Sequence, residues 1–474
     1  MKTEKPIKTI LTDVAMNLNS DRAGTEKSVC VIGAGIAGLT AAYRLSCRGY
    51  KVTVIECTMN PGGMVSTFSM GWEKIEHIYH HIFTSDQFVL DLAEELAIDD
   101  QLQWLEPMDA LYVNKHLYPF TSPADLLRFK AIPVIERIRT GLMVLKAKRI
   151  DDLPALESMT AKKWLLQEGG QRTYDTLWKP LLKSKFDDDY DKVSAVWIWN
   201  KFKLRGNSRS KSISKESLGY MKGGFGTLVI ALVKAIEARG GSILYGYTAL
   251  DITKEIPKSG MKHFRISCVL SDCSSVVLKT DSIIATLSGV RFANMTKDLN
   301  LPALYIKKAM NVKYKGNLCL VLRLKKSLSP YYWTTVCDPL PFVVVIEHTN
   351  LTSLRKYGGH VVYLSRYLDI SDPLWTQSDS DIYKLFCKGL AEMYPEFTPA
   401  DVKDWRLTRT RYAQPVINQS YSIHMPEMKT PEAGLILAGM AQIYPEDRGM
   451  NYAIRLGNDS SDLIDEYFQR TELV

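Results

Sequence analysis

Long apolar runs are missing from this chain. No stretch approaches the ~18 residues that a membrane-spanning helix needs. The first 26 residues are polar and lack the apolar core of ~7 to 15 residues found in a secretory signal sequence. We therefore expect residues 1–26 to be a flexible N-terminal extension of an intracellular, cytoplasmic protein without an integral membrane segment.

Cysteine pairs and a strong charge of one sign are also missing. The eight cysteines are scattered and none forms a C-x-x-C pair, so dithiol redox sites and the common zinc motifs are not indicated. We expect buried, reduced thiols. The formal net charge of +8 over 474 residues is far below that of a dedicated nucleic-acid binder. This composition suits a phosphorylated or acidic small substrate and gives no indication of a nucleic-acid partner.

Glycines are concentrated in one short segment close to the N-terminus. An apolar run, residues 29–32, leads into Gly33-Ala34-Gly35-Ile36-Ala37-Gly38, a helical pattern and a second apolar run that ends at Glu56. In such a unit Gly33 permits the turn, Gly35 lets backbone N–H groups reach a pyrophosphate, and Gly38 lets the helix pack on the strand. The helix N-terminus adds free donors and a favourable dipole for an anion. The predicted nucleotide-binding residues therefore include Gly33, Gly35, Ile36, Ala37 and Gly38.

An acidic residue completes this nucleotide-binding pattern. Glu56 lies 18 residues after Gly38, where a carboxylate can accept both hydroxyls of an adenosine ribose. A second unit of strand, Gly-x-Gly turn and helix is absent from the chain. The sequence thus predicts one tightly held dinucleotide, and any nicotinamide cofactor would visit without a Rossmann site of its own.

The residues that follow Glu56 identify the dinucleotide by resemblance. Glu56, five further residues, Gly62-Gly63 and Thr67 resemble the E-x5-GGR-x-x-T extension of an FAD-binding clan. This clan includes monoamine oxidases, phytoene desaturases, protoporphyrinogen oxidases and UDP-galactopyranose mutases. The resemblance implies FAD, with the paired glycines along its pyrophosphate. Met64 stands where the clan usually has arginine.

Later segments extend the resemblance along the chain. Residues 219–253 are similar to the clan's second FAD-side segment, in which Ala249 matches the position that meets the adenine half. Residues 434–464 resemble the closing motif, in which a strand ends at Gly439 and a helix then begins under the flavin. The resemblance implies that the N–H groups near Met450 and Asn451 face the flavin O2 edge, and that Asp447 and Arg448 contact ribityl, phosphate or substrate.

The clan's organisation implies two domains that are interleaved in sequence. We expect an α/β fold, with a Rossmann-like FAD-binding domain of the GR2 type and a substrate domain of mixed β-sheet plus a helical cap. The predicted divisions after the N-terminal extension are FAD-binding parts at 27–87, 216–298 and 426–474, a helical cap and substrate region at 88–215, and a substrate-domain sheet at 299–425.

Three of the eight histidines lie within residues 77–81. His77 and His81 would share one face of a helix and could bind a metal, but no further ligand at a suitable spacing is evident, so we predict no metal site. His81-Ile82-Phe83 is similar to the "HIF" element of UDP-galactopyranose mutases. We expect His81 and His77 to line the flavin cavity as neutral hydrogen-bonding or proton-transfer groups. The alternative is that these histidines support the loop.

Two further groups are candidates for catalysis. Glu347 and His348 end an apolar run and could form an acid/base pair or a structural hydrogen bond. Monoamine oxidases of the clan usually place a lysine near the flavin, and Lys313 or Lys315 offers only a poor match to it.

Residues 88–205 have a helical pattern and many basic side chains. A capping signal, Ser122 with Pro123 and Asp125, begins one such helix. The basic stripe that follows could lie on a membrane surface, guide an anionic substrate, or be the solvated face of the cap. Lys201, Lys203, Arg205, Arg209 and Lys211 could hold a phosphate.

The sequence therefore predicts an FAD-dependent oxidoreductase. It would transfer a hydride equivalent between a small, anionic or phosphorylated substrate and the flavin, with NAD(P)H or another electron acceptor as partner. The alternative is a flavin-dependent sugar-nucleotide isomerase like UDP-galactopyranose mutase, a reaction without net oxidation.

Overall fold

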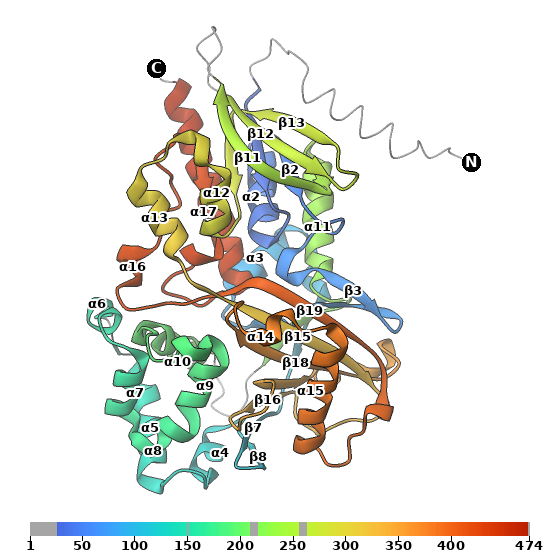
Figure 1. Ribbon diagram of the computed structural model, residues 1–474, viewed down its shortest axis with the longest axis vertical. Helices are drawn as coiled ribbons and strands as arrows, with labels where there is room; N and C mark the ends of the chain where they lie inside the picture. The colour runs from blue at the N-terminus through green and yellow to red at the C-terminus, as the bar shows by residue number, and fades with distance from the viewer. Residues whose placement is uncertain (1–25, 148, 151, 209–216, 256–262, 473–474) are drawn as a thin grey trace.

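The structure is a computed structural model that describes residues 26–147, 149–150, 152–208, 217–255 and 263–472. A nucleotide-binding half lies at the top of Figure 1, and a second sheet flanked by a helical cap lies below it. The predicted N-terminal extension falls outside the described residues, except for Glu26. The predicted fold class, an α/β protein with a Rossmann-like FAD-binding domain and a second domain of sheet and cap, is confirmed.

The nucleotide-binding half is built on a five-stranded parallel sheet, here called the nucleotide sheet. Its order is β10-β2-β1-β14-β20. Side chains on one face, such as Val31 and Val54, pack with helices α2, α11 and α17, while Ile32 and Ile55 on the other face pack with a three-stranded antiparallel sheet, β11-β12-β13. Burial on both faces explains why these strands are almost continuously apolar. The strands are β1 (Ser28–Ile32), β2 (Lys51–Glu56), β10 (Ser242–Tyr245), β11 (Tyr247–Glu255), β12 (His263–Leu270), β13 (Ser275–Thr280), β14 (Ser282–Ala285) and β20 (Leu435–Leu437), and the helices are α2 (Ile36–Cys47), α11 (Gly226–Glu237) and α17 (Met450–Glu472).

The second domain is built on a seven-stranded sheet, here called the substrate sheet. Its order is β19-β15-β18-β17-β16-β7-β8, and all neighbours are antiparallel except β16 and β7. Helix α15 (Asp379–Met393) packs on the face that carries Leu318 and Leu320, whereas Cys319 and Val321 point to the opposite face. The strands are β7 (Asp109–Val113), β8 (His116–Pro119), β15 (Tyr314–Leu324), β16 (Trp333–Val336), β17 (Val344–Glu347), β18 (His360–Leu368) and β19 (Val402–Pro415).

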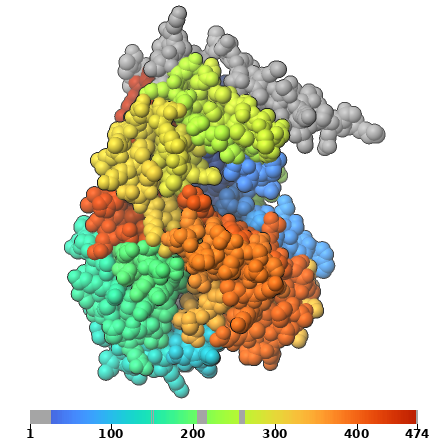
Figure 2. All heavy atoms as spheres, viewed as in Figure 1, coloured from blue at the N-terminus to red at the C-terminus, as the bar shows by residue number. Residues whose placement is uncertain are grey.

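The cap is a group of helices within residues 123–208. Figure 2 shows it in green beside the orange part of the substrate sheet. Its core is rich in aromatic side chains, including Trp164, Trp197 and Trp199. Ser122 caps α4 as predicted, because its hydroxyl accepts from the N–H of Asp125. The cap helices are α4 (Pro123–Arg128), α5 (Val134–Ala147), α6 (Leu153–Glu157), α7 (Ala161–Gly169), α8 (Gln171–Thr173), α9 (Lys179–Phe186) and α10 (Ala195–Ser208).

The prediction of a helical pattern over residues 88–205 is wrong between residues 102 and 119. Strands β7 and β8 lie there and form one edge of the substrate sheet, while β6 (Leu102–Leu105) pairs with β9 (Leu218–Met221). These strands have only four or five residues each, so partners distant in sequence decide their structure. The remaining elements are β3 (Thr67–Met70), β4 (Glu73–Glu76), β5 (Ile82–Phe83), α3 (Gln87–Glu95), α12 (Gly289–Met295), α13 (Ala303–Asn311), α14 (Pro373–Thr376) and α16 (Tyr421–His424).

Two expectations from composition can be compared with the structure. All eight cysteines are free; Cys47, Cys57 and Cys273 are exposed, so the expectation that the thiols are buried holds for only part of them. No helix in the described part of the chain is long and apolar enough to cross a membrane.

A buried ion-pair cluster joins the cap to the substrate sheet. The ammonium of Lys315, whose side chain is 1% exposed, lies 2.8 Å from a carboxylate oxygen of Asp189 in the cap. Lys313 lies 2.7 Å from the same oxygen, and the lysines hold the pKa of Asp189 well below its usual range despite its burial. Both lysines are thus engaged by the cap, which agrees with their poor match to the flavin-side lysine of amine oxidases.

We expect Asp189→Ala to destabilise the protein by about 3–5 kcal/mol, because it removes the nearest partner of a buried cation. Thermal or urea unfolding of the variant measures this loss. Lys313→Ala is the matched control, since Lys313 is 47% exposed and we expect a change below about 1 kcal/mol. An equal effect of the two substitutions would contradict this explanation.

Candidate active site

The predicted glycine turn connects β1 to α2. Gly33 has a φ of +107°, and a Cβ at Gly38 would lie 2.0 Å from the carbonyl oxygen of Gly33. Only glycine therefore allows this approach of helix to turn. Gly35 is the N-cap residue of α2 and provides no side-chain capping bond, so the first N–H groups of the helix, which lack partners within it, are left for an anion.

Glu56 and the Gly62-Gly63 pair lie against this turn. One carboxylate oxygen of Glu56 accepts from the N–H of Ala34 at 2.9 Å. The N–H of Gly62 donates to the carbonyl of Ala34 at 2.8 Å, and Gly62 and Gly63 both have positive φ. The structure thus brings together the predicted turn, the ribose-binding acid and the glycine pair.

A cavity of about 640 Å³ separates this glycine pair from strand β19 of the substrate sheet. Gly63, Met64 and His77, three of the predicted residues, line its wall. Nδ1 of His77 lies 3.0 Å from Oγ1 of Thr408 on β19. Burial, together with the charge of Arg406, lowers the pKa of His77 to about 4. His77 is therefore neutral near pH 7, as predicted for a residue lining the cavity.

A second polar cluster lies where the cap, β18, β19 and the residues before α17 meet; we call it the Arg448 cluster. Nε of Arg448 donates to Oε1 of Gln414 at 3.0 Å, and its Nη2 donates to the hydroxyl of Tyr367. The ammonium of Lys185 on α9 lies 4.7 Å from the centre of the Tyr367 ring. The members of the cluster are Lys185, Lys201, Tyr367, Gln414, Asp447 and Arg448.

Positive charge dominates this cluster. Burial lowers the pKa of Lys185, and the neighbouring Arg448 adds to this shift. Although burial alone would raise it, the charges of Arg448 and Lys185 bring the pKa of Tyr367 below its usual value. Three cations surround one carboxylate, so the cluster is suited to an anionic ligand.

The carboxylate of Asp447 is fully engaged within the protein. It accepts from Trp197 Nε1 at 3.1 Å and from Gln414 Nε2 at 3.1 Å, and its other oxygen lies 2.5 Å from Nζ of Lys201. Asp447 thereby holds α10 of the cap against β19. Its predicted contact with ribityl, phosphate or substrate stays a prediction. Of the lysines and arginines predicted to hold phosphate, Lys201 is in the cluster. Arg209 and Lys211 lie outside the described residues.

The three clustered histidines enter three different environments. His77 faces the cavity, whereas Nδ1 of His81 lies 3.1 Å from the hydroxyl of Tyr332, and its ring packs against Phe83 and Trp333. Nδ1 of His80 lies 2.7 Å from the carbonyl of Ile78. A carbonyl only accepts, so Nδ1 of His80 carries the proton and Nε2 keeps its lone pair.

His80 was not among the residues predicted from the sequence. Of the three histidines, it is the one that is both neutral and near the Arg448 cluster. Burial lowers its pKa to about 4, and the charges of Arg448 and Lys185 act in the same direction. It is thus neutral and near the cationic cluster. The catalytic role predicted for His81 stays a prediction, and its contacts describe packing of the loop.

Glu347 and His348 do not bond to each other in the manner of an acid/base pair. Glu347 accepts from the Ser327 hydroxyl at 2.6 Å and from two backbone N–H groups of the same turn. Nε2 of His348 lies 3.2 Å from the hydroxyl of Tyr357. Glu347 pairs with Val362 on β18, five residues before Tyr367, so this pair is remote from the Arg448 cluster. Each side chain bonds to other partners, and the catalytic role predicted for Glu347 and His348 stays a prediction.

The burial of His348 has a consequence for acid stability. Burial lowers its pKa to about 3, below the value of about 6.5 in an unfolded chain. The unfolded state therefore binds more protons between these values, and the contribution of neutral His348 to stability is lost as pH falls below about 6.5.

We expect the stability gap between the parent protein and His348→Phe to shrink by roughly 2–3 kcal/mol between pH 7.5 and pH 4.5. Unfolding of the two proteins at both pH values measures the change, and their difference cancels the other titrating groups. The same substitution at exposed His424 is the control and should leave the gap unchanged. A gap that widens in acid would contradict the argument.

The remaining predicted residues lie on the nucleotide-binding half. Ala249 is on β11 at a bulge, beside Cys268. A Cβ at Gly439 would lie 2.2 Å from the carbonyl of Leu287, so the chain passes close to the neighbouring strand end. Met450 begins α17, and Oδ1 of Asn451 accepts from Val89.

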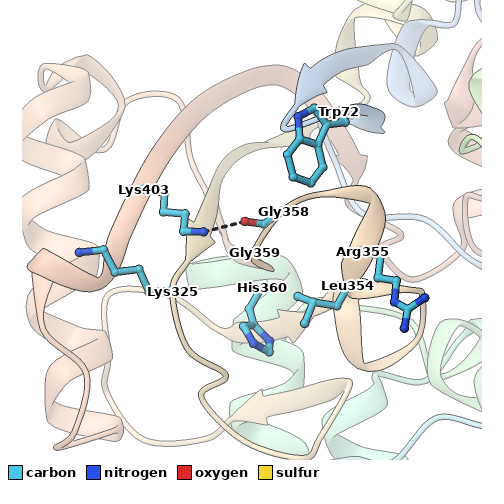
Figure 3. Close-up of a pocket in the computed structure, with 8 residues that line it drawn as sticks. All are labelled: Trp72, Lys325, Leu354, Arg355, Gly358, Gly359, His360 and Lys403. Atoms are coloured by element: carbon cyan, nitrogen blue, oxygen red, sulfur yellow. Dashed lines mark hydrogen bonds between the residues drawn. The ribbon is translucent and has the colours of Figure 1, made fainter.

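A separate surface hollow of about 500 Å³ lies at the other end of β18 (Figure 3). Trp72, which is 82% exposed, borders it, and Lys403 donates to the carbonyl of Gly358 at 2.7 Å. His360 begins β18, whereas Tyr367 lies near its end. None of the predicted site residues lines this hollow, so we place the candidate active site at the His77 cavity and the Arg448 cluster.

Comparison with known proteins identifies the family of this chain. Residues 36–464 match the flavin-containing amine oxidoreductase family. The chain belongs to this family. The protein is an FAD-dependent enzyme. Its turn, helix N-terminus and Glu56 offer donors and an acceptor that suit the pyrophosphate and ribose of FAD.

Individual relatives of this protein are distant in sequence. Coproporphyrinogen III oxidase of Staphylococcus aureus is 24% identical over 259 residues, which are 48% of this chain and 55% of that enzyme. A zeta-carotene desaturase of Zea mays is 21% identical over 472 residues, covering 88% of this chain and 79% of that one. The match therefore spans about half of the first relative and most of the second.

Solved structures show the same fold. A putative protoporphyrinogen oxidase from Exiguobacterium sp. 255-15 has a TM-score of 0.73 at 16% identity, covering 94% of this chain and 99% of that one. Reduced UDP-galactopyranose mutase has a TM-score of 0.68 at 15% identity, covering 93% of each chain. These likenesses concern the fold, and they do not determine the substrate or the reaction of this protein.

Proposed function

We propose that this enzyme oxidises a small substrate that carries a carboxylate or a phosphate. The main observation in support of this proposal is the Arg448 cluster, in which Lys185, Lys201 and Arg448 surround one carboxylate. An excess of cations among partly buried side chains is stabilised when an anion binds. Because Asp447 is held by Trp197, Lys201 and Gln414, it neutralises the cluster only in part.

In this proposal the protein supplies binding, orientation and proton transfer. The glycine turn would hold FAD, which would supply the acceptor for the hydride equivalent. Arg448 and Lys185 would hold the anionic group, and the hydrogen bond from Arg448 to Gln414 would fix the guanidinium. Nε2 of neutral His80 would accept the proton that the substrate N–H or O–H loses. The cap, tied to β19 through Asp447, would exclude water.

The electron acceptor that restores oxidised FAD is part of the proposal. The described residues hold one nucleotide sheet of Rossmann type. A nicotinamide cofactor or another acceptor would therefore reach the flavin without a nucleotide-binding domain of its own. Reoxidation of the reduced enzyme by oxygen, NADP⁺ or a quinone, followed by absorbance, identifies the acceptor.

Anaerobic reduction of the purified flavoprotein tests the substrate class. We expect the flavin absorbance to bleach with amino acids, hydroxy acids or phosphorylated compounds that carry an anionic group, and not with neutral amines of the same size. Bleaching by neutral compounds alone would overturn the proposal.

The isomerase alternative predicts a different outcome in the same cuvette. A cationic cluster also suits a sugar diphosphate, and this reaction needs reduced flavin without net oxidation. Enzyme reduced by dithionite is incubated with sugar nucleotides, and the products are separated. Ring-isomerised sugar would favour the isomerase, whereas an unchanged sugar together with bleaching by anionic substrates favours the oxidoreductase.

A further inference from the structure

An apolar stripe on the outside of the cap has no partner among the residues that the structure describes. Helix α5 (Val134–Ala147) buries Thr140, Met143 and Ala147 against the cap core. Its opposite side exposes large aliphatic side chains, and Leu127 at the end of α4 adds another. The fractions exposed are Leu127 58%, Val134 61%, Ile135 74%, Ile138 51%, Leu142 52% and Leu145 62%.

The spacing of these residues makes the stripe continuous. Ile135, Ile138, Leu142 and Leu145 are three or four residues apart, so they lie on one side of the helix. A helix that packs one face on its own protein normally turns polar residues to solvent. On α5 both sides are apolar, which calls for an apolar environment on the outer side.

Basic side chains border the stripe and acidic ones are turned away from it. Residues 123–149 contain seven lysines and arginines and only two acidic residues, Asp125 and Glu136. Asp125 caps α4, and Glu136 accepts from the N–H and hydroxyl of Thr173 inside the cap. Exposed cations of the described residues here are Arg128, Lys130, Arg139, Lys146 and Arg149.

Two of these cations also contact helix α7. Lys146 lies 3.2 Å from Glu168, yet its side chain remains 67% exposed. Arg139 donates to the carbonyl of Gln167. Glu168 is the acidic group facing this edge from α7, and it offsets one of the five exposed cations.

We infer that α5 docks the cap on the surface of an anionic lipid bilayer. An aliphatic stripe flanked by cations is the pattern of a helix that lies in the interface, with its apolar side among the acyl chains and its cations near the headgroups. The charge complementarity selects anionic lipid. The stripe has no exposed aromatic side chain or methionine, whereas the cores of protein interfaces are enriched in both.

Hydrogen bonds made by helix α10 join the docking surface to the candidate active site. Trp199 on α10 donates to the carbonyl of Ala147, the last residue of α5, at 2.8 Å. Trp197 and Lys201 on the same helix hold Asp447 of the Arg448 cluster. A membrane-bound α5 would therefore place the cap side of the site next to lipid. The inference rests on the exposed stripe and its charges, and it stands or falls independently of the proposed reaction.

Cosedimentation of the flavin-loaded enzyme with vesicles tests the inference. We expect binding to vesicles of phosphatidylcholine mixed with phosphatidylserine, and binding weaker by about tenfold or more to pure phosphatidylcholine or in high salt. Ile138→Asn combined with Leu142→Asn should weaken binding to the mixed vesicles by at least about tenfold. Lys130→Glu should weaken it to a smaller extent and only in low salt.

Matched controls separate lipid binding from other effects. Leu304→Asn changes a side chain that is 69% exposed on α13 and should bind vesicles like the parent protein. All variants concern exposed side chains, so flavin content and melting temperature should stay unchanged. Absence of binding to the mixed vesicles would overturn the inference. Self-association without lipid that the double substitution abolishes would do the same, because α5 would then join two copies of the chain.

Discussion

Gly35→Asp should yield a folded protein that no longer retains FAD. Gly35 is the N-cap of α2 with β-region φ and ψ, a conformation in which aspartate is a favoured cap. The nearest atom to a new Cβ is Cα of Gly63 at 3.9 Å, an ordinary contact. The carboxylate would take the N–H groups meant for the pyrophosphate and repel its charge.

We expect FAD affinity to fall by more than about 1,000-fold, which corresponds to about 4 kcal/mol. The melting temperature of the protein without FAD should stay the same or rise, since an N-cap stabilises a helix by about 1 kcal/mol. Gly35→Ser caps the helix without a charge and should keep measurable affinity. Flavin fluorescence titration and thermal unfolding measure both quantities. A yellow Gly35→Asp protein with normal turnover would show that FAD is held elsewhere.

Arg448→Met should reduce kcat/KM for an anionic substrate by roughly two orders of magnitude. Truncating one partner of a buried, hydrogen-bonded charge contact costs about 2–5 kcal/mol. The flavin content should not change, because Arg448 bonds to Gln414 and Tyr367 of the substrate sheet. Steady-state kinetics with an anionic substrate and a neutral analogue of the same shape measure the selectivity.

Two further arginine variants sharpen this experiment. Arg448→Lys keeps the charge but loses the forked geometry, and we expect an intermediate loss. Arg406→Met changes the arginine that stacks on Phe68 beside the His77 cavity and should affect the anionic and neutral substrates alike. If Arg448→Met also lowered both equally, the cluster would not be the site of the anionic group.

The nucleotide site was predictable because its determinants are local. A glycine with positive φ at 33, a glycine at 38 where a Cβ would meet backbone, and an acid at the end of β2 all lie within one strand, turn, helix and strand. Each of these structural requirements selects one type of residue at a fixed position in the motif. The same is true of Ser122 and Asp125, whose cap spans three residues.

The Arg448 cluster was only partly predictable because its members meet through sheet register. Tyr367 on β18 is opposite Asn317 on β15, and Gln414 on β19 is opposite Lys315. An irregularity between Lys315 and Asn317 shifts the pairing by two residues, because Asn317 faces Thr410. No spacing in the sequence reveals that irregularity, so Tyr367, Gln414 and Lys185 carried no signal of their own.

The sequence could not show which of the neighbouring residues His80 and His81 points towards the candidate site. His80 and His81 directly precede strand β5, and successive side chains of an extended segment point to opposite sides. The sequence showed imidazoles near the flavin side but could not decide which of two neighbours points to the site. The structure turns His80 towards the cations and His81 towards Tyr332.

The strands of the nucleotide sheet come from distant parts of the chain, so the sheet cannot be completed early in translation. β1 and β2 are made first, β10 and β14 follow about two hundred residues later, and β20 with α17 is made last. The pair of β1 and β2 therefore waits, with both outer edges unpaired, until β10 and β14 have been made, and the outer edge of β14 stays unpaired until β20 follows. Such a nascent chain would depend on chaperones during this delay, and coenzyme uptake would be one of the last events in the maturation of the enzyme.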